Sequence, residues 1–237
     1  MEGGGNVPFL NFFAELPHDF YLNFIKDERY MLMLQGLGNT LLISFFAIVL
    51  GILFGTITFF LRRSRFSVLR GIGYVYVDVI RATPMVTQLL IIYFVIFGAV
   101  DISPILVAIL AFGFNSGAYV SEILRAGFQS IDRGQMEAGR SLGLSSRQTM
   151  IHIIAPQAIK NTLPTLCNEF IVLIKETAVA GYISIQDLTR AADMIRSLTY
   201  DAFLPLIVAA LIYYSIIKIL TLAIARLERH LRASDHR

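Results

Sequence analysis

The chain is short of charge and of cysteine, and each shortage narrows the class of protein it can be. Only 16% of its 237 residues are charged, whereas 56% are hydrophobic, and the mean hydropathy is +0.66. The net charge of +3 is too small to indicate nucleic-acid binding. This composition predicts an all-α integral membrane protein with a single domain.

Several motifs are absent as well. Cys167 is the only cysteine, which excludes an internal disulfide and a cysteine-based metal cluster. The four histidines show no metal-ligand spacing, so we expect no bound metal. No H-E-x-x-H or G-x-S-x-G segment occurs, which counts against an intramembrane enzyme. No G-x-x-x-x-G-K-[ST] phosphate loop occurs, so the chain is not expected to hydrolyse ATP itself. The first residues lack the basic and apolar regions of a cleaved signal peptide.

Long apolar runs are the dominant feature that is present. A spanning helix needs roughly 20 mostly apolar residues. The expected spans are residues 31–61, 82–100, 102–121, 163–183 and 202–225. The fourth is interrupted by Glu169, Lys175 and Glu176, and the fifth contains Lys218. Before the first span, an aromatic-rich segment is expected either to lie on the outer leaflet as an interfacial helix or to be disordered.

Loop charge predicts the orientation of these five spans, which place the two termini on opposite sides. One side holds Arg62, Arg63, Arg65, Arg70, Arg125, Arg133, Arg140, Arg147, Lys160, Arg226, Arg229, Arg232 and Arg237. The other side holds Lys26, Arg29, Arg190 and Arg196. Because basic residues are enriched in cytoplasmic loops, we expect the N-terminus outside and the C-terminus inside.

The loop after the third span contains the charged amphipathic segment EAGRSLGLSSRQTMIHIIAP. Residues 135–142 are expected to form a short helix that Gly143 ends in a left-handed conformation. Ser145 or Ser146 then caps a second helix, which Pro156 ends. Its apolar side is expected to comprise Met136, Leu142, Leu144, Met150 and Ile151, with Glu137, Arg140 and Arg147 at the rim. Such a two-helix knob can be gripped by a soluble partner; the alternative is an ordinary amphipathic loop helix resting on the membrane.

The same segment resembles the "EAA" coupling loop of ABC importer permeases, whose consensus is Glu-Ala-Ala, three residues, Gly, nine residues, Ile, one residue, Leu-Pro. Gly139 stands in place of the third Ala and Ala155 in place of Leu. The residues that this resemblance assigns to coupling with the ATPase are Glu137, Ala138, Gly139, Arg140, Gly143 and Pro156.

Three further segments are similar to the polar amino acid permease family. They are Arg81-Ala82-Thr83-Pro84 with Gln88, Asn115-Ser116-Gly117-Ala118-Tyr119-Val120-Ser121-Glu122, and Asn168-Glu169-Phe170 with Leu173-Ile174-Lys175-Glu176-Thr177. The resemblance covers about residues 35–230. It implies the type I ABC importer permease fold, with an extracytoplasmic segment 1–30, a transmembrane domain 31–230 containing the coupling loop 125–160, and a cytoplasmic tail 231–237.

The resemblance also implies partners and a location. Two permease chains, identical or related, would sit on a dimer of cytoplasmic ABC ATPase subunits in the lipid of the bacterial inner membrane. A soluble extracytoplasmic binding protein would deliver a polar amino acid, with basic or amide side chains favoured. No cofactor is expected in this chain, because ATP and Mg would bind the partner subunit.

The expected substrate path comprises Glu169, Asn168, Asn115, Ser116, Gln88, Arg81, Lys175 and Thr177. An ion inside the bilayer costs at least ~2.5–3.5 kcal/mol, so Glu169 requires a reason. It pairs with a basic substrate, forms an internal ion pair with Lys175 or Arg81, or has a neutral gating role. Arg81 either receives a substrate carboxylate or pairs with Asp78. Pro84 is expected to start or kink a helix.

The remaining polar residues of the path and the paired glycines have structural alternatives. Asn115, Ser116 and Gln88 either contact substrate or hydrogen-bond neighbouring helices. Gly51 and Gly55 form a G-x-x-x-G pattern that favours helix packing over a gate. The alternative functions are an ABC permease for another solute, such as an osmolyte or a phosphonate, and a stand-alone channel or carrier.

Overall fold

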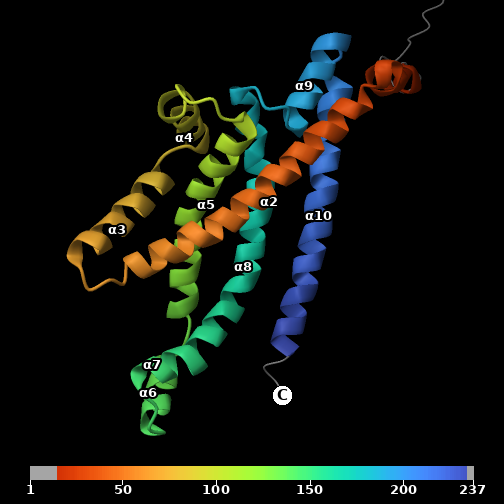
Figure 1. Cartoon of the computed structure of the whole chain (residues 1–237). Coiled ribbons are helices and arrows are strands. Elements are labelled where there is room, and N and C mark those ends of the chain that lie inside the picture. Colours follow the sequence, from red (N-terminus) through yellow and green to blue (C-terminus); the bar gives the residue numbers. More distant parts are fainter. Residues whose placement is uncertain (1–14, 234–237) are drawn as a thin grey trace, which may run out of the picture.

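The computed structural model describes residues 15–233, with side chains as far as Arg229. The described residues are helices joined by short turns (Figure 1). In chain order the elements are η1 (Tyr21–Ile25), η2 (Lys26–Glu28), α2 (Tyr30–Leu61), α3 (Ser67–Ala82), α4 (Met85–Leu90), η3 (Ile91–Ile96), α5 (Pro104–Gln129), α6 (Arg133–Ser141), α7 (Ser146–Thr149), η4 (Met150–Ile154), α8 (Ala155–Glu176), η5 (Thr177–Ile183), α9 (Leu188–Thr199) and α10 (Phe203–Ala233). Of the expected terminal segments, residues 1–14 and 234–237 lie outside the described residues.

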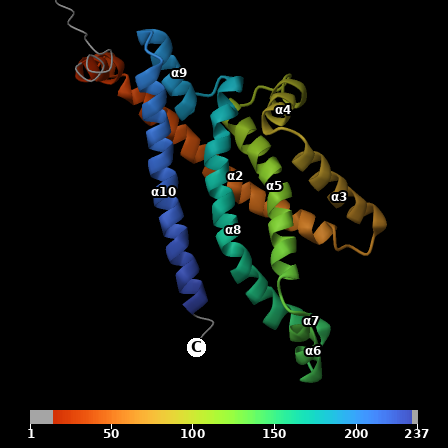
Figure 2. The same ribbon diagram turned by 180° about the vertical axis from the view of Figure 1, so that it is seen from behind.

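The long helices form one bundle with two distinct ends. α5, α8 and α10 run side by side, and α2 crosses them obliquely (Figures 1 and 2). The start of α2, the α4 segment and α9 lie at one end, whereas α6, α7 and the C-terminal end of α10 lie at the other. The chain therefore reverses direction after each long helix.

Three helices are long and apolar enough to cross a membrane: Tyr30–Leu61, Pro104–Gln129 and Phe203–Arg229. They correspond to the first, third and fifth expected spans. The pair Ser67–Ala82 and Met85–Ile96 passes the same test together. α8 occupies the position of the fourth expected span, but its polar residues make it less apolar than these helices.

The second expected span, residues 82–100, is helical from Met85 to Ile96 and begins after a break at Thr83 and Pro84. α3 ends at Ala82, Thr83 is extended (φ −117°, ψ 143°), and a new helix begins after Pro84. The two halves meet at 111°. The cause is local, because proline excludes the α conformation from the residue before it and has no N–H to donate.

The expected helix end at Pro156 is also wrong. A π-helical turn, η4, joins α7 to α8, and the Ala155 N–H bonds Met150 O instead of the carbonyl four residues back. Pro156 then lies in the first turn of α8, where a missing N–H costs little. The helix consequently begins eight residues before the expected position and ends at Glu176, with η5 replacing the expected final turns.

α2 and α5 pack through the paired glycines of α2. A methyl group at Gly51 would lie 2.8 Å from Ser116 Oγ, and one at Gly55 would lie 2.6 Å from Val120 Cβ. The helices can therefore approach closely only because these positions lack a side chain. The packing interpretation of the G-x-x-x-G pattern is confirmed.

The segment before α2 is mostly helical, with a break at Asp27 and Glu28, which have positive φ, and it packs against α9 and α10. Asn23 is buried; its Nδ2 donates to Asp201 Oδ2 (2.7 Å), and its Oδ1 accepts from Thr199 Oγ1 (2.7 Å). Phe24 is buried in the same cluster as Leu204. Disorder is therefore not observed for residues 15–29, and the segment braces the turn between α9 and α10.

Candidate functional site: a two-helix knob and a charged pocket

The knob consists of α6, the turn after it, and α7, and it lies at the far end of the bundle (Figure 1). Asp132 caps α6 by accepting from the Gly134 N–H. Gly143 has φ 85°, the left-handed conformation expected of it. Ser145 forms a capping box with Gln148, through bonds of 3.2 and 2.8 Å. The predicted pair of helices joined at a glycine is confirmed.

The two helices of the knob are held together at Gly139. A methyl group at this position would lie 2.5 Å from Thr149 Cγ2. Thr149 is completely buried and donates from Oγ1 to Ser145 O (3.1 Å). Gly139 thus replaces the alanine of the EAA consensus because Thr149 occupies the space of a methyl group.

The outer surface of the knob is apolar and charged. Leu142 is 81% exposed, and Ile151, in η4 directly after α7, is 50% exposed. Glu137 and Arg147 are exposed beside them. The knob therefore presents exposed apolar side chains with a charged rim, as the sequence predicts.

A cavity of about 530 Å³ lies above the knob between α3, α5 and α8. Its polar lining residues are Arg81, Tyr119, Glu122, Arg125, Ser130, Asn161, Thr162, Thr165, Asn168 and Glu169. The volume is in the range of small-molecule sites. Three of the expected path residues, Arg81, Asn168 and Glu169, meet in this cavity.

Glu169 reaches the cavity from α8 and is 91% buried, being only 9% exposed. Its Oε1 accepts a hydrogen bond from Ser116 Oγ of α5 (2.8 Å). Among the described residues, no ion pair joins Glu169 to Lys175 or Arg81, so the expected alternative of an internal ion pair is not formed. A carboxylate whose partner is a neutral hydroxyl retains its capacity to attract a cation.

A cluster of charges around Glu122 contributes Arg81, Glu122 and Arg125 to the lining of the same cavity. Glu122 Oε2 accepts from Arg125 Nη2 at 2.6 Å, its Oε1 accepts from Arg62 Nη1, and Arg81 Nη1 lies 3.8 Å away. The expected pairing of Arg81 with Asp78 is wrong, because Arg81 reaches across to α5 and approaches Glu122. Within the described residues, Arg62 Nε is buried without a hydrogen-bond partner.

Gln88 and Asn115 lie outside this cavity and bond each other. Asn115 Nδ2 donates to Gln88 Oε1 (2.9 Å), and Gln88 Nε2 donates to Ile80 O and Thr83 O (2.8 and 3.1 Å). These bonds satisfy carbonyls that the break at Pro84 leaves free. The structure therefore gives both amides a packing role.

The last two expected path residues follow Glu169 in the chain: Lys175 lies in the last turn of α8, and Thr177 begins η5. Lys175 is exposed, and Thr177 is buried with its hydroxyl donating to Ile174 O (2.9 Å). Neither residue lines the cavity. Within the described residues, no group of three or more His, Cys, Asp or Glu side chains is placed to hold a metal ion.

Comparison with known proteins identifies this architecture. Residues 34–233 match the family described as the inner membrane component of binding-protein-dependent transport systems. The chain belongs to this family. The permease, as we now call it, is 38% identical to the arginine transport system permease protein ArtQ of Bacillus subtilis (strain 168), over 86% of this chain and 94% of that protein. It is 35% identical to the L-cystine transport system permease protein TcyB of the same organism, over 95% and 96% of the two chains.

Solved structures agree. A crystal structure of an amino acid ABC transporter with histidines matches the permease with a TM-score of 0.82 and 40% identity, covering 87% of this chain and 98% of that chain. An inward-facing structure of the MetNI methionine ABC transporter matches with a TM-score of 0.68 at 18% identity, over 85% and 97% of the two chains, and shows the fold alone. The resemblance to polar amino acid permeases, inferred from the sequence motifs, is confirmed.

The charge cluster of the permease is the part of the site that the sequence motifs missed. Its members come from three helices, and Arg62 and Glu122 are 60 positions apart in the chain. Glu122 was visible only as the last residue of the N-S-G-A-Y-V-S-E segment. The available signal was one carboxylate, Glu122, and three arginines at the ends of apolar runs, but the sequence alone does not show which arginine lies nearest to the carboxylate.

Proposed function

We propose that the permease is the transmembrane subunit of an ATP-driven importer that moves polar amino acids, preferably those with basic or amide side chains, into a bacterial cytoplasm. Its relatives include proteins named as arginine, glutamine and cystine permeases, which supports this substrate class. A soluble binding protein delivers the amino acid, and a dimer of ABC ATPases binds a pair of permease chains. ATP and Mg belong to those ATPases.

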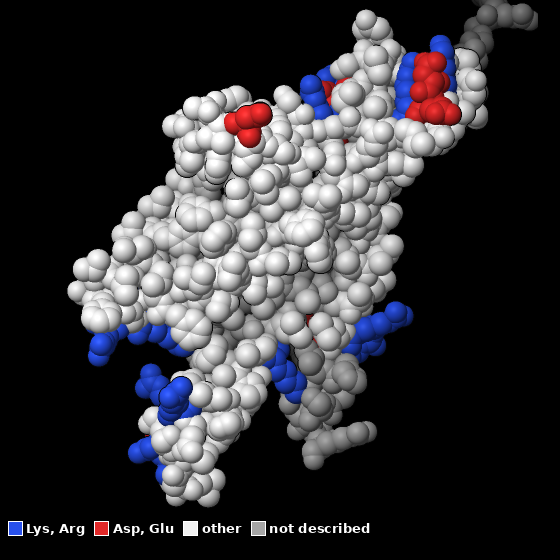
Figure 3. Space-filling view, in the orientation of Figure 1, with Lys and Arg blue, Asp and Glu red and all other residues white. Residues whose placement is uncertain are grey.

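In this proposal the chain crosses the inner membrane five times, with the N-terminus outside and the C-terminus inside. The bent pair formed by α3 and α4–η3 supplies the second crossing and α8 the fourth, which accounts for the reversal of direction along the chain (Figures 1 and 2). Figure 3 shows lysine and arginine side chains along the lower edge of the white body and on the knob. Basic residues gather on the cytoplasmic side, which supports this orientation.

One observation carries the substrate assignment: the buried Glu169 carboxylate faces a cavity of amino-acid size and has a neutral hydroxyl as its partner. In a site of low dielectric constant, a carboxylate of this kind favours an ammonium or guanidinium group over an apolar one. Asn168 on the same wall supplies an amide that can donate or accept.

The knob supplies the mechanical link in this proposal. ATP binding draws the ATPases together and moves the knobs of both permease chains, and α8 carries that movement to Glu169. A ligand-driven change of this kind requires contacts that differ between the two states. Glu137→Lys is expected to abolish substrate-stimulated ATPase activity without impairing membrane insertion. Glu15→Lys, an exposed change at the opposite end, is the control. Normal stimulation in the first variant excludes Glu137 from coupling.

The substrate class is tested by direct binding. Radiolabelled arginine, histidine, glutamine and glutamate are added separately to the purified complex of permease and ATPase. Selective binding of arginine or histidine that is lost in Glu169→Gln, but kept in Glu176→Gln on the same helix, supports the proposal. Binding with unchanged preference in Glu169→Gln makes Glu169 structural and contradicts the assignment of the site.

A further inference from the structure

The connection between α2 and α3 combines arginines with exposed apolar side chains and lacks acidic residues. Residues 62–77 contain no Asp or Glu. We define the turn patch as Arg63, Arg65, Phe66, Val68 and Arg70. All five of these side chains are exposed, Phe66 by 55% and Val68 by 72%. None of these five residues lines the cavity described above.

The arginines of the turn patch differ from their neighbour Arg62 in having no carboxylate partner. Arg62 pairs with Glu122. In the part of the chain that the structure describes, Arg63, Arg65 and Arg70 form no ion pair. The Arg63 guanidinium lies over the Phe59 ring at 4.2 Å, and Phe128 lies at 5.1 Å from the same group. The aromatic rings orient this cation but leave its charge uncompensated.

The helix that follows the arginines exposes an apolar surface. Ile72 and Val75 are 55% and 63% exposed, and α3 buries only Gly73, Val77 and Ile80. Exposed side chains of this kind on a membrane protein contact acyl chains. Cationic side chains thus lie next to exposed apolar side chains. The former can contact the anionic headgroup of a phospholipid and the latter its acyl chains.

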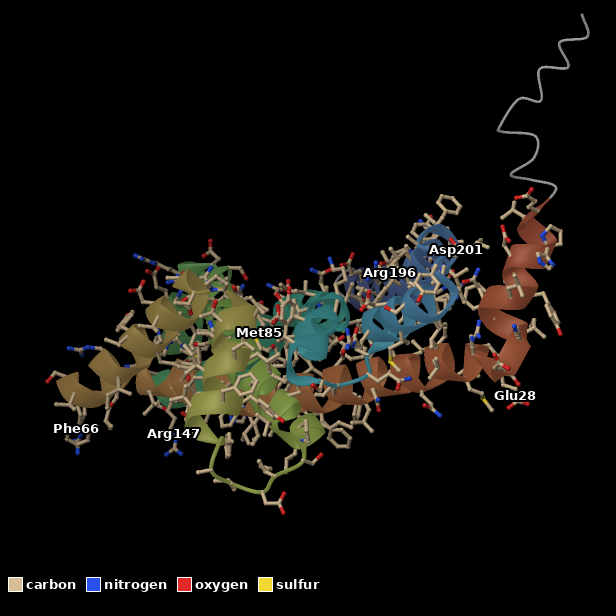
Figure 4. All side chains as sticks on the ribbon, turned by 90° about the horizontal axis from the view of Figure 1, so that it is seen from above. Glu28, Phe66, Met85, Arg147, Arg196 and Asp201 are labelled. Atoms are coloured by element: carbon tan, nitrogen blue, oxygen red, sulfur yellow. The ribbon has the colours of Figure 1, made fainter. Side chains whose placement is uncertain are left out.

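The position of the turn patch fits the boundary of the membrane. The connection between α2 and α3 lies closer to the middle of the bundle than the knob does (Figure 1). Viewed from above, Phe66 lies at the lateral edge of the molecule, at the opposite extreme from Glu28 (Figure 4). The lower edge of the white body in Figure 3, below α3, carries blue side chains. A surface at this level and at this edge faces lipid headgroups.

We propose that the turn patch binds the headgroup of an anionic phospholipid in the cytoplasmic leaflet. The phosphate lies among the guanidinium groups of Arg63, Arg65 and Arg70, and an acyl chain lies along Ile72 and Val75 of α3. Three uncompensated positive charges favour an anionic headgroup over a zwitterionic one. The inference rests on the proposed orientation for its leaflet, but not on the proposed substrate.

The lipid preference can be measured because the chain contains no tryptophan. Phe66→Trp places a single indole in the turn patch of the full-length chain. The variant is reconstituted in mixed vesicles of phosphatidylglycerol and phosphatidylcholine in which only one of the two lipids carries brominated acyl chains. We expect brominated phosphatidylglycerol to quench the indole more strongly than brominated phosphatidylcholine at the same mole fraction.

Three sets of variants make the measurement specific. Combining Phe66→Trp with Arg63→Gln, Arg65→Gln and Arg70→Gln should remove the preference, at about fivefold in local enrichment for each arginine. Combining it with Arg226→Gln and Arg229→Gln, which removes two positive charges outside the turn patch, should preserve it. Phe94→Trp, an equally exposed aromatic position at the other end of the bundle, should show no preference.

Two results overturn the inference. Equal quenching by both brominated lipids means that the patch does not select an anionic headgroup. Absence of quenching by either lipid means that protein covers the patch, as an acidic surface of the ATPase would. Circular dichroism of each variant establishes that it is folded. If Phe66→Trp alone shows no lipid preference but the protein binds amino acids normally, only the lipid site is rejected. If Phe66→Trp shows the preference but the protein binds no amino acid, only the proposed substrate is rejected.

Discussion

Ser116 joins three helices of the permease through one small side chain. Its hydroxyl donates to Glu169 of α8 at 2.8 Å, and the space beside it is available only because Gly51 of α2 has no side chain. The serine itself lies on α5 and is completely buried. The carboxylate that faces the cavity is therefore fixed by the same contact that sets the spacing of α2 and α5.

This contact predicts unequal effects of two conservative changes. Ser116→Ala leaves the buried carboxylate without its donor and is expected to cost about 1–3 kcal/mol of stability. Glu169→Gln preserves an oxygen that accepts from Ser116 and should cost less. Thermal unfolding in detergent, followed by circular dichroism, compares the two variants. Equal losses would contradict a stabilising role for the Ser116–Glu169 bond.

The close contact inside the knob predicts a destabilising reversion to the family consensus. Gly139→Ala places a methyl group 2.5 Å from Thr149 Cγ2, and overpacking of this kind costs about 1–3 kcal/mol. The change should lower the unfolding temperature and weaken substrate-stimulated ATPase activity.

Thr149→Ala in the same chain removes the atoms that clash. The double variant should therefore lose less stability than the sum of its single variants, which is the signature of two residues in contact. Strict additivity in a double-mutant cycle would show that Gly139 and Thr149 do not constrain each other.

The charge cluster predicts a ranking of its arginines. The Arg62 side chain is 10% exposed and contacts Glu122 directly, whereas the Arg81 side chain is 45% exposed and lies 3.8 Å from it. Arg62→Gln should cost several kcal/mol because it leaves a largely buried carboxylate with fewer partners. Arg81→Gln should cost about 1 kcal/mol or less. Chemical unfolding of both variants gives the comparison, and a reversed order would refute the ranking.

The start of α9 predicts a pH dependence. Asp187 is completely buried and accepts from the Thr189 and Arg190 N–H groups. Burial raises the pKa of Asp187 above its ordinary value of 3.8. The folded protein therefore holds this proton more tightly than the unfolded chain, and the resulting stabilisation is present below pH 3.8 and lost as the pH rises through the raised pKa.

Asp187→Asn keeps the cap of α9 but removes the titration. The wild type should lose stability relative to this variant as the pH is raised from about 4 to about 8. Unfolding temperatures of both proteins across this range provide the measurement. Parallel curves would mean that Asp187 has the same pKa in the folded and unfolded chains.

Most of the helices could be predicted from the sequence because hydrocarbon-length runs leave little choice of structure. The first expected span, 31–61, differs from α2 by one residue. The knob was equally accessible, since Gly143 and Ser145 act locally through backbone conformation and capping. The two prolines differ in outcome. Pro84 precedes a new helix, as expected of it, whereas Pro156 is accommodated by a π-helical turn and does not end the helix.

The site could be predicted in part. Glu169 and Asn168 are adjacent on α8, and both line the cavity. Glu169 could be predicted because a carboxylate inside a membrane is costly and usually functional. The partners of Glu169 and Arg81 could not be predicted, because each is chosen by the packing of α8 and α3 against α5. The sequence predicts which helix a residue belongs to. Its contact on a neighbouring helix depends on the distance and rotation between the two helices, which the sequence does not show.

The unbroken passage from η4 into α8 makes the knob and the cavity parts of one lever. α8 has 22 residues and is therefore about 33 Å long. Glu169 lies 14 residues beyond the start of α8, about 21 Å along the helix, so a rigid tilt of about 5° at the knob end would displace Glu169 by about 2 Å. The Gly139–Thr149 contact packs the two helices of the knob tightly together. A force applied to the knob would therefore move α8 instead of deforming the knob.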